Sequence, residues 1–324
     1  MRFGLLLPHF GSAASHETLL AGAREAERLG FDSLWVRDHL LFEPHGMEDP
    51  DPTFVEPFVT LAYLGGATSR IGLGTATVIP FRHPIHLAQC MASLDFMLPG
   101  RSLEMGIGAG NDQKEFEAVG LGDANRVELM RTHVQIARQF WQGTPVDFDD
   151  SRYSIHGKTL KPTPRAPVPV WWGGLTPAST RLAAEFCEGW LPGRIDFRTW
   201  QVRVEQLANA CKERGRDMVL RGAVPVVSMA DSRAEALSKV NVDGLLAHAN
   251  KQRFMVKPAS GSFQSAADLE GFLLADTPAG VRTQVERYRE LGSDLLILDF
   301  RFRYPDWFDQ MRTFRDDVMG GTLA

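Results

Sequence analysis

Cysteines and long apolar runs are both scarce in this sequence. Three cysteines occur among 324 residues, Cys90, Cys187 and Cys211, far apart and in apolar, helix-like surroundings. This spacing argues against a disulfide framework or a cysteine-bound metal, and it predicts buried free thiols. No window reaches the uninterrupted apolar length of about 20 residues that a membrane-spanning helix needs, so we expect no membrane partner.

A surplus of basic residues is missing as well. The chain has 35 Lys and Arg against 40 Asp and Glu, a formal net charge of −5, with no basic stripe interleaved with aromatic residues. We therefore expect no nucleic-acid partner. The start of the chain, Met1-Arg2-Phe3-Gly4, enters an apolar segment without the pattern of a secretory leader, which predicts a cytoplasmic protein.

No change in composition along the chain marks a linker, and no internal repeat is present beyond an alternation of strand-like and helix-like segments. Apolar residues make up 44% of the chain and charged residues 23%, which is typical of a soluble globular enzyme. We therefore expect residues 1–324 to form a single domain.

The most informative stretch lies between residues 70 and 110. Apolar and small residues run unbroken from Ile71 to Pro80, which predicts a strand buried on both faces, as in parallel sheets. A helix is expected to begin at Pro84, and a second apolar strand runs from Ser102 to Ala109. Strand, helix and strand in this order predict a right-handed parallel unit whose ligands lie beyond the carboxyl ends of the strands.

The same alternation extends over the whole chain and predicts eight strands, at 3–8, 32–36, 71–80, 102–109, 168–172, 189–192, 222–229 and 295–300. The economical interpretation is an α/β protein, a single (β/α)₈ TIM barrel with loop insertions. An open doubly wound sheet is the alternative. However, the first strand-turn-helix has no Gly-x-Gly-x-x-Gly, and no acidic residue follows it to hold a ribose.

Two long loops are expected to shape the substrate pocket. Residues 41–57 are rich in Pro, Asp, Glu and His and should form an irregular loop on the site side of the barrel. Residues 251–275 lack clear periodicity and are rich in serine, with Gly261 among them, which favours a mobile lid.

Several polar residues and glycines follow the predicted strands. His39, after the second strand, could act as a general acid or base, or simply hydrogen-bond the next loop. The glycines at 106, 108 and 110 would allow close approach of a flat ligand or tight packing of neighbouring elements. Gly173 and Gly174 precede Thr176-Pro177, a helix start whose free N–H groups could hold a phosphate.

A metal site is a weaker hypothesis. His83 and His86 are spaced i, i+3 at a predicted helix start, but the sequence supplies no third ligand near them. The first strand also lacks the His-x-His of a metal-dependent barrel hydrolase. We therefore expect no metal, and a stoichiometric metal in elemental analysis would revive the hydrolase hypothesis.

Four motifs in order resemble the bacterial luciferase-like flavin oxidoreductases, and they are the segments 31–39, 70–84, 94–110 and 172–190. Segment 31–39 reads Phe-Asp-Ser-Leu-Trp-Val-Arg-Asp-His, and segment 70–84 contains Arg-Ile-Gly-Leu-Gly-Thr and Arg-His-Pro. Segment 94–110 contains Leu-Asp, Pro-Gly-Arg and Gly-Ile-Gly-Ala-Gly, and segment 172–190 contains Trp-Gly-Gly and Glu-Gly-Trp. The likeness covers residues 1–195 and resumes weakly at 277–300. It is closest to the members that use the deazaflavin F420, and next closest to the FMN-dependent monooxygenases.

The resemblance implies a flavin or deazaflavin ring across the carboxyl mouth of the barrel, a homodimer, and a non-proline cis peptide near Ala76-Thr77. By carry-over, His39 and Asp38 are the candidate catalytic residues at the edge of the ring. The resemblance also implies a set of cofactor-binding residues, in which the last three take the phosphate: Ala76, Thr77, Gly108, Ala109, Gly110, Asn111, Gly173, Gly174 and Thr176.

The implied activity is that of a flavin-dependent oxidoreductase acting on a small organic substrate. Reduced F420 would serve for hydride transfer, or reduced FMN with O₂ for monooxygenation, and a separate flavin or F420 reductase is a possible partner. The alternative is a non-catalytic flavin-binding barrel. One departure argues against sugar-phosphate chemistry: the F420-dependent glucose-6-phosphate dehydrogenases have an acidic glutamate where this chain has Asn111.

Overall fold

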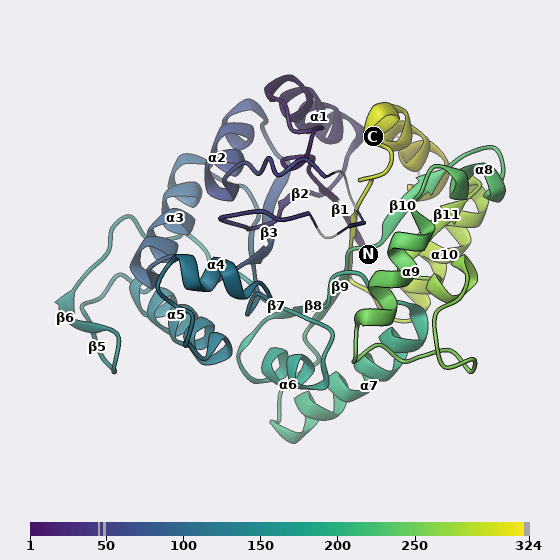
Figure 1. Ribbon diagram of the computed structural model, residues 1–324. Helices are drawn as coiled ribbons and strands as arrows, with labels where there is room; N and C mark the ends of the chain where they lie inside the picture. The colour runs from purple at the N-terminus through teal and green to yellow at the C-terminus, as the bar shows by residue number, and fades with distance from the viewer. Residues whose placement is uncertain (45, 48–49, 321–324) are drawn as a thin grey trace.

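The computed structural model describes residues 1–44, 46–47 and 50–320, and in this part of the chain eight parallel strands close into a barrel (Figure 1). Around the barrel the order is β1-β12-β9-β8-β7-β4-β3-β2. The barrel strands are β1 Arg2–Leu6, β2 Ser33–Val36, β3 Gly72–Val78, β4 Leu103–Ile107, β7 Val170–Gly173, β8 Gly189–Leu191, β9 Leu220–Ala223 and β12 Leu295–Leu298. The expected (β/α)₈ barrel is thereby confirmed.

Helices surround the barrel as an outer ring (Figure 1). They are α1 His16–Leu29, α2 Pro57–Ala67, α3 Pro84–Met97, α4 Gln113–Ala118, α5 Arg126–Trp141, α6 Pro177–Phe186, α7 Phe197–Glu213, α8 Arg233–Ser238, α9 Val242–Lys251, α10 Pro278–Glu290 and α11 Trp307–Thr313. Single turns occur at η1 Ala266–Leu269 and η2 Tyr304–Asp306, and α11 continues as the π-helix η3 Phe314–Met319. None of these helices is long and apolar enough to cross a membrane.

Local sequence signals place the helix ends. Ser15 caps α1 by accepting a hydrogen bond from the Thr18 N–H, and Gly30 ends the helix in the left-handed conformation at φ 82°. Proline occupies the first turn of α2, α3, α6 and α10, where its missing N–H costs nothing. The strand-helix alternation could be predicted because these signals are local.

Tryptophans fill the interior of the barrel, opposite glycines on neighbouring strands. A side chain on Gly4 or Gly74 would lie within about 2.6 Å of the Trp35 indole, and one on Gly189 would lie 2.2 Å from Trp171. The Trp171 Nε1–H donates to the buried Glu104 carboxylate at 2.8 Å. The small residues therefore make room for the large ones, which close the barrel beneath its mouth.

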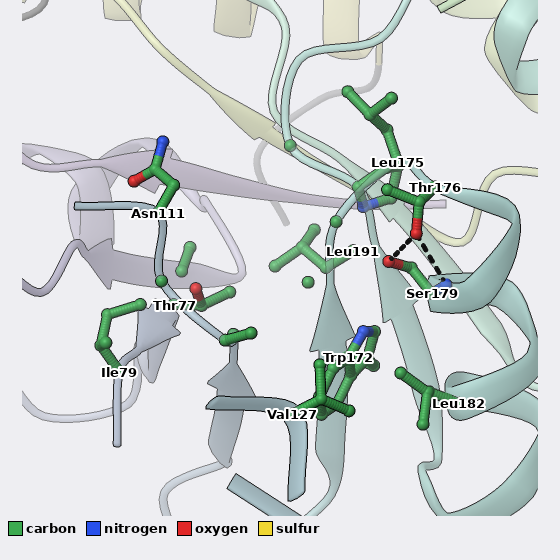
Figure 2. A pocket seen from close by; sticks show the side chains of 18 of the residues that line it. Thr77, Ile79, Asn111, Val127, Trp172, Leu175, Thr176, Ser179, Leu182 and Leu191 are labelled. Atoms are coloured by element: carbon green, nitrogen blue, oxygen red, sulfur yellow. Dashed lines mark hydrogen bonds between the residues drawn. The ribbon is translucent and has the colours of Figure 1, made fainter. Parts of the chain in front are cut away.

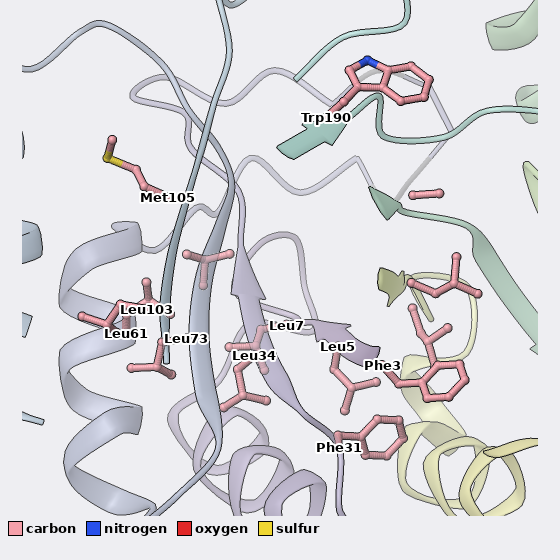
Figure 3. Close-up of a cluster of buried hydrophobic side chains, with 14 of the residues drawn as sticks. Phe3, Leu5, Leu7, Phe31, Leu34, Leu61, Leu73, Leu103, Met105 and Trp190 are labelled. Carbon is pink, nitrogen blue, oxygen red and sulfur yellow. The ribbon is translucent and has the colours of Figure 1, made fainter. Parts of the chain in front are cut away.

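The outward faces of the strands pack against the helices in one large hydrophobic cluster (Figure 3). Along β1 the side chains alternate, so that Phe3 and Leu5 belong to this outer cluster while Leu6 belongs to the interior one. Cys187 and Cys211 are buried in the outer cluster, and Cys90 packs against it half-buried. All three are free thiols, as expected.

The seventh strand differs from the expectation of one strand over 222–229. The barrel strand β9 ends at Ala223, and the chain continues outside the barrel as β10 Val226–Met229, which pairs with β11 Leu273–Asp276. Pro225 lies at the break. It has no N–H to donate to a ladder, and its carbonyl accepts a hydrogen bond from the Asp299 N–H at 3.0 Å.

The segment expected to be a lid, 251–275, contains η1 and the start of β11, and much of it is buried. Met255, Phe263, Leu269 and Phe272 form a second hydrophobic core with residues of β10, α8 and α9. Serine and glycine in the exposed turn at 258–262 concealed this core from sequence inspection. That the segment acts as a lid stays a prediction.

A hairpin between α5 and β7 projects from the barrel (Figure 1). Its strands β5 Val146–Asp149 and β6 Ser154–Lys158 are antiparallel, and Val146 and Ile155 pack with α3 and α5. Among the described residues the Tyr153 hydroxyl contacts Nε2 of the buried His133 at 2.7 Å, while His133 Nδ1 has no hydrogen-bond partner.

Candidate functional site

A cavity of about 510 Å³ lies at the carboxyl ends of β2, β3, β4, β7 and β8. This volume is in the range of small-molecule and cofactor sites. Gly106 does not line this cavity, whereas all the candidate catalytic and cofactor-binding residues do: Asp38, His39, Ala76, Thr77, Gly108, Ala109, Gly110, Asn111, Gly173, Gly174 and Thr176. Figure 2 shows Thr77, Ile79 and Asn111 on one side of it and Leu175, Thr176 and Ser179 on the other.

The floor of the cavity is the irregular end of β3. The Ala76–Thr77 peptide is cis, and the β3–β4 register shifts between Thr75 and Val78. The non-proline cis peptide that the resemblance implied is therefore present. Thr77 fills the space over two glycines, because a Cβ on Gly108 would lie 2.6 Å from its Oγ1 and a Cβ on Gly173 would lie 2.9 Å from its Cγ2.

His39 is held by a carboxylate that sequence inspection overlooked. Its Nδ1 lies 3.0 Å from Oε2 of Glu115 on α4, and the Glu115 side chain is 3% exposed. The other oxygen, Oε1, accepts hydrogen bonds from the N–H groups of Leu40 and Leu41 at 2.6 and 2.9 Å. The carboxylate therefore fixes both the imidazole and the start of the loop that follows it.

The buried His9 holds the backbone at Arg37, just before Asp38 and His39. Burial lowers the pKa of His9 to about 4, which keeps its imidazole neutral. In that form Nε2 accepts a hydrogen bond from the Arg37 N–H at 3.1 Å while Nδ1 donates to the Leu7 carbonyl at 3.0 Å. The Arg37 guanidinium lies 4.6 Å from the ring centre of Phe10, so β1 and β2 are tied together beside the pocket.

Asp38 has a different environment from His39. Its carboxylate is fully buried and forms a two-pronged ion pair with Arg82, at 2.5 and 2.9 Å, and it also accepts from the Ile79 N–H at 3.0 Å. Burial raises the pKa of Asp38 although Arg82 opposes the shift. The contacts hold the end of β3 in place. The catalytic role expected of Asp38 stays a prediction, and this geometry favours positioning over proton transfer.

The far end of the pocket is the loop from β7 to α6. Thr176 caps α6, with its Oγ1 accepting from the Ser179 N–H at 3.0 Å and lying 2.9 Å from the Ser179 Oγ (Figure 2). Gly174 has φ 108°, and a side chain there would lie 2.7 Å from the Ser179 Oγ. An anion at this end would meet the amino terminus of a ten-residue helix.

Sequence reasoning missed several residues of the site. Glu115 lies on a short helix away from any strand end, and its burial depends on the fold. Gln252 and Phe254 reach the pocket from the segment after α9, and Trp172 and Leu191 contribute apolar walls. The one feature of the sequence that could have pointed to Glu115 is a carboxylate close to the glycines after β4. Its pairing with a histidine 76 residues earlier could not be seen in the sequence.

Comparison with known proteins identifies the family of this chain. The model of the luciferase-like monooxygenase family matches residues 1–295. The chain belongs to this family. An F420-dependent hydroxymycolic acid dehydrogenase of Mycobacterium tuberculosis is a relative at 31% identity over 249 residues, 74% of this chain and 65% of the relative. An F420-dependent glucose-6-phosphate dehydrogenase of Microbacterium testaceum is 33% identical over 192 residues, 56% of this chain and 55% of the relative.

The matched regions thus span between about half and two thirds of the length of these members of the family. Two solved structures show the same barrel over almost the whole chain. An F420-dependent secondary alcohol dehydrogenase with an F420-acetone adduct has a TM-score of 0.80 at 20% identity, covering 98% of both chains. The FMN-bound oxygenating constituent of 3,6-diketocamphane monooxygenase of Pseudomonas putida has a TM-score of 0.80 at 19% identity, covering 98% of this chain and 97% of that one.

Proposed function

We propose that the protein is an oxidoreductase that transfers a hydride between F420 and a small carbonyl or alcohol substrate. The observation that carries this proposal is the His39–Glu115 pair at the pocket. Reduction of a carbonyl requires a proton at its oxygen in addition to the hydride, and a histidine oriented by a carboxylate is suited to that task. The F420-dependent relatives at 31 and 33% identity support F420, whereas the FMN-bound structure supports the fold alone.

The residues of the pocket fit a flat ring with a phosphate-bearing tail. Gly174 leaves space where a side chain would fill the cradle beside Ser179, and the amino terminus of α6 faces the same end. Thr77 and Ile79 offer a surface at the other end for the ring (Figure 2). A bound F420 would supply or accept the hydride, and the protein would supply binding, orientation and a proton.

His39 is the residue that we assign to proton transfer. With Nδ1 directed to Glu115, Nε2 is the atom that would give a proton to the substrate oxygen or take one from it. In the structure this atom lies 3.5 Å from the Arg37 Nη2, a contact that the substrate oxygen would replace. The Glu115 carboxylate would stabilise the imidazolium form and keep the ring in one orientation. Apolar residues such as Trp172, Leu182 and Leu191 would exclude water from the reacting atoms.

Asp38 is assigned a positioning role. Its ion pair with Arg82 and its contact with the Ile79 N–H join the end of β2 to the end of β3. The position of the Ala76–Thr77 segment relative to His39 therefore depends on a buried carboxylate that exchanges no proton with the substrate. Asn111, in place of the glutamate of the sugar-phosphate dehydrogenases, favours a substrate of another class.

Binding measurements with the purified protein test the cofactor. We expect the fluorescence of F420 to change on titration with the protein, and FMN to bind more weakly. Bound reduced F420 should then be oxidised by a small ketone such as cyclohexanone. A His39→Asn variant should bind F420 equally well and turn over slowly, whereas a matched change at the exposed His156 should leave both properties intact.

Other outcomes of the same experiment select other functions. Binding of FMN alone, with oxygen consumption when a separate flavin reductase is added, would replace hydride transfer by monooxygenation. Binding of either cofactor without turnover of any carbonyl or alcohol would favour a flavin-binding barrel that is not an enzyme. Binding of neither cofactor would refute the proposal.

A further inference from the structure

Two carbonyl groups of the loop between β7 and α6 are pinned from outside the pocket. The Gly174 carbonyl accepts a hydrogen bond from Nε1 of Trp190 on β8 at 3.0 Å. The next carbonyl, that of Leu175, accepts one from Nε of Arg203 on α7 at 2.7 Å. Both donors are buried, with Trp190 at 0% and Arg203 at 5% exposure. The orientation of two successive peptide groups is therefore fixed.

This orientation determines where the next N–H groups point. In a planar trans peptide the N–H is antiparallel to the C=O, so the N–H groups of Leu175 and Thr176 point away from Trp190 and Arg203. Both residues line the pocket (Figure 2). In the described part of the chain neither N–H has an acceptor. Successive unpaired backbone N–H groups are a common way to bind an anion.

Arg203 also carries a charge that no acid balances. Its other contacts are the Gln206 Oε1 at 3.2 Å and the carbonyl of Phe254. No carboxylate of the described residues lies within ion-pair distance, and burial lowers the pKa of its guanidinium. An arginine remains protonated in this setting, so a buried positive charge stands directly behind the Leu175 carbonyl.

The contact with Phe254 links a second wall to the same guanidinium. Phe254 lines the pocket and its side chain is 47% exposed, while its carbonyl accepts from the Arg203 Nη2. One side chain thus holds the loop that carries Thr176 and the segment after α9. Thr176 and Phe254 are 78 residues apart in the sequence.

We infer that Arg203 is a positioning residue for the anionic group of the cofactor. It turns the N–H groups of the 174–176 loop toward the pocket, supplies a positive charge behind them, and fixes the Phe254 segment over the same end. The anion is a phosphate ester if the proposed function is right, and the inference rests on that function for the identity of the ligand. Arg203 itself contacts backbone and a glutamine, and acts through the loop.

Pairs of cofactors with and without phosphate provide the test. We expect Arg203→Met to weaken the binding of F420 and of FMN by roughly tenfold or more, an effect that corresponds to the loss of one good anion contact. Binding of 8-hydroxy-5-deazariboflavin and of riboflavin, which have the rings without the phosphate, should change less than twofold. Arg203→Lys should recover part of the loss, because it keeps the charge and one donor.

Arg216, in the segment just after the end of α7, is a matched control. It donates to the carbonyls of Ala184 and Cys187 at 2.7 and 2.9 Å, at the carboxyl end of α6 and away from the pocket. Arg216→Met should lower stability by a similar amount without separating the phosphate-bearing from the phosphate-free cofactors. An equal loss for both kinds of cofactor in Arg203→Met would show that Arg203 merely supports the fold, and would overturn the inference.

Inorganic phosphate separates this inference from the proposed function. If neither F420 nor FMN binds, the function fails, and phosphate titration can be followed at the backbone amide resonances of Leu175 and Thr176. Shifts in the native protein that are reduced at least fivefold in Arg203→Met would support the inference alone. If those amides do not respond to phosphate, or respond equally in the variant, the inference is wrong whatever the cofactor.

Discussion

The Nδ1 atom of His39 lies 3.0 Å from one oxygen of Glu115, and the other oxygen of that carboxylate accepts hydrogen bonds from the N–H groups of Leu40 and Leu41. One buried acid on α4 therefore serves both the residue that we assign to proton transfer and the backbone that follows it. Removing its charge should affect the chemistry more than the fold.

A change at Glu115 tests this relationship. Glu115→Gln keeps the size of the side chain and loses the charge that stabilises the imidazolium. We expect kcat to fall by about 10- to 100-fold, and His39→Asn to lower it by about 10²- to 10⁴-fold. F420 affinity, measured by fluorescence titration, should change little in either variant. Unaltered kcat in Glu115→Gln would assign the carboxylate to the backbone alone.

The Asp38–Arg82 pair should matter for stability. Arg82→Met would leave the Asp38 carboxylate, whose side chain is fully buried, without its charged partner. We expect the free energy of unfolding to drop by about 3–5 kcal/mol. Urea unfolding measures it. The control is Glu56→Gln, which removes the exposed second partner of Arg82 and should cost less than about 1 kcal/mol. Equal losses of stability in the two variants would contradict the stabilising role assigned to the buried Asp38–Arg82 pair.

Two buried histidines predict a loss of stability in acid. Burial lowers the pKa of His9 and of His133 to about 4, below the value near 6.5 of an unfolded chain. The unfolded state thus binds more protons between pH 6.5 and 4, so the free energy of unfolding decreases as the pH falls through this window. Each histidine accounts for at most about 3 kcal/mol. His133→Leu should flatten the profile, and an unchanged slope would refute the prediction.

The contact between Thr77 and Gly108 predicts a rescue experiment. Gly108→Ala should destabilise the protein by about 1–3 kcal/mol, because the new methyl would lie 2.6 Å from the Thr77 Oγ1. Adding Thr77→Ala should restore most of the stability. Gly106→Ala is the control that Thr77→Ala cannot rescue, since its methyl would lie 2.0 Å from the Thr75 backbone oxygen. Thermal unfolding of Gly108→Ala and of Gly106→Ala, each with and without Thr77→Ala, measures these stabilities.

We propose that the outer faces of α2 and α3 form a homodimer interface. No residue of α2 is charged, and Val59 and Tyr63 on it are 65% and 43% exposed, as are Phe96 and Met97 on α3 at 67% and 68%. Val59→Glu should convert a dimer to a monomer in size-exclusion chromatography with light scattering. Val202→Glu on α7, 37% exposed, should not. A monomeric parent protein would exclude the interface.

Much of the fold could be predicted because its signals are local. Ser15 and Gly30 mark the ends of α1 through hydrogen bonds within a few residues. The prolines mark the starts of α2, α3, α6 and α10, because a first turn does not use the N–H that proline lacks. The position of the site followed from the rule that ligands lie at the carboxyl ends of parallel strands. The division of the seventh strand was missed because apolar residues continue on both sides of Pro225, and only the pairing of β10 with β11 reveals it.

The roles of individual site residues were harder to predict. Gly108 was predicted to approach the ring and Gly173 to take the phosphate, and both roles stay predictions. The structure adds that the missing side chains of these glycines make room for Thr77. Asp38 and His39 are adjacent in sequence and yet face different partners, because side chains of consecutive residues at a strand end point in different directions. Glu115 and Arg203 depend on contacts across the fold that no local pattern encodes.

The double use of Glu115 separates the loop after β2 into two parts. Leu40 and Leu41 are tethered to the same carboxylate as the imidazole, so insertions or deletions before residue 42 would displace the proton-transfer group. Beyond Leu41 the described chain contacts the same group through aromatic rings, because the rings of Phe42 and Phe54 each lie 5.3 Å from the His39 imidazole. An exchange of this loop that is meant to change substrate preference alone should therefore keep Phe42 and Phe54.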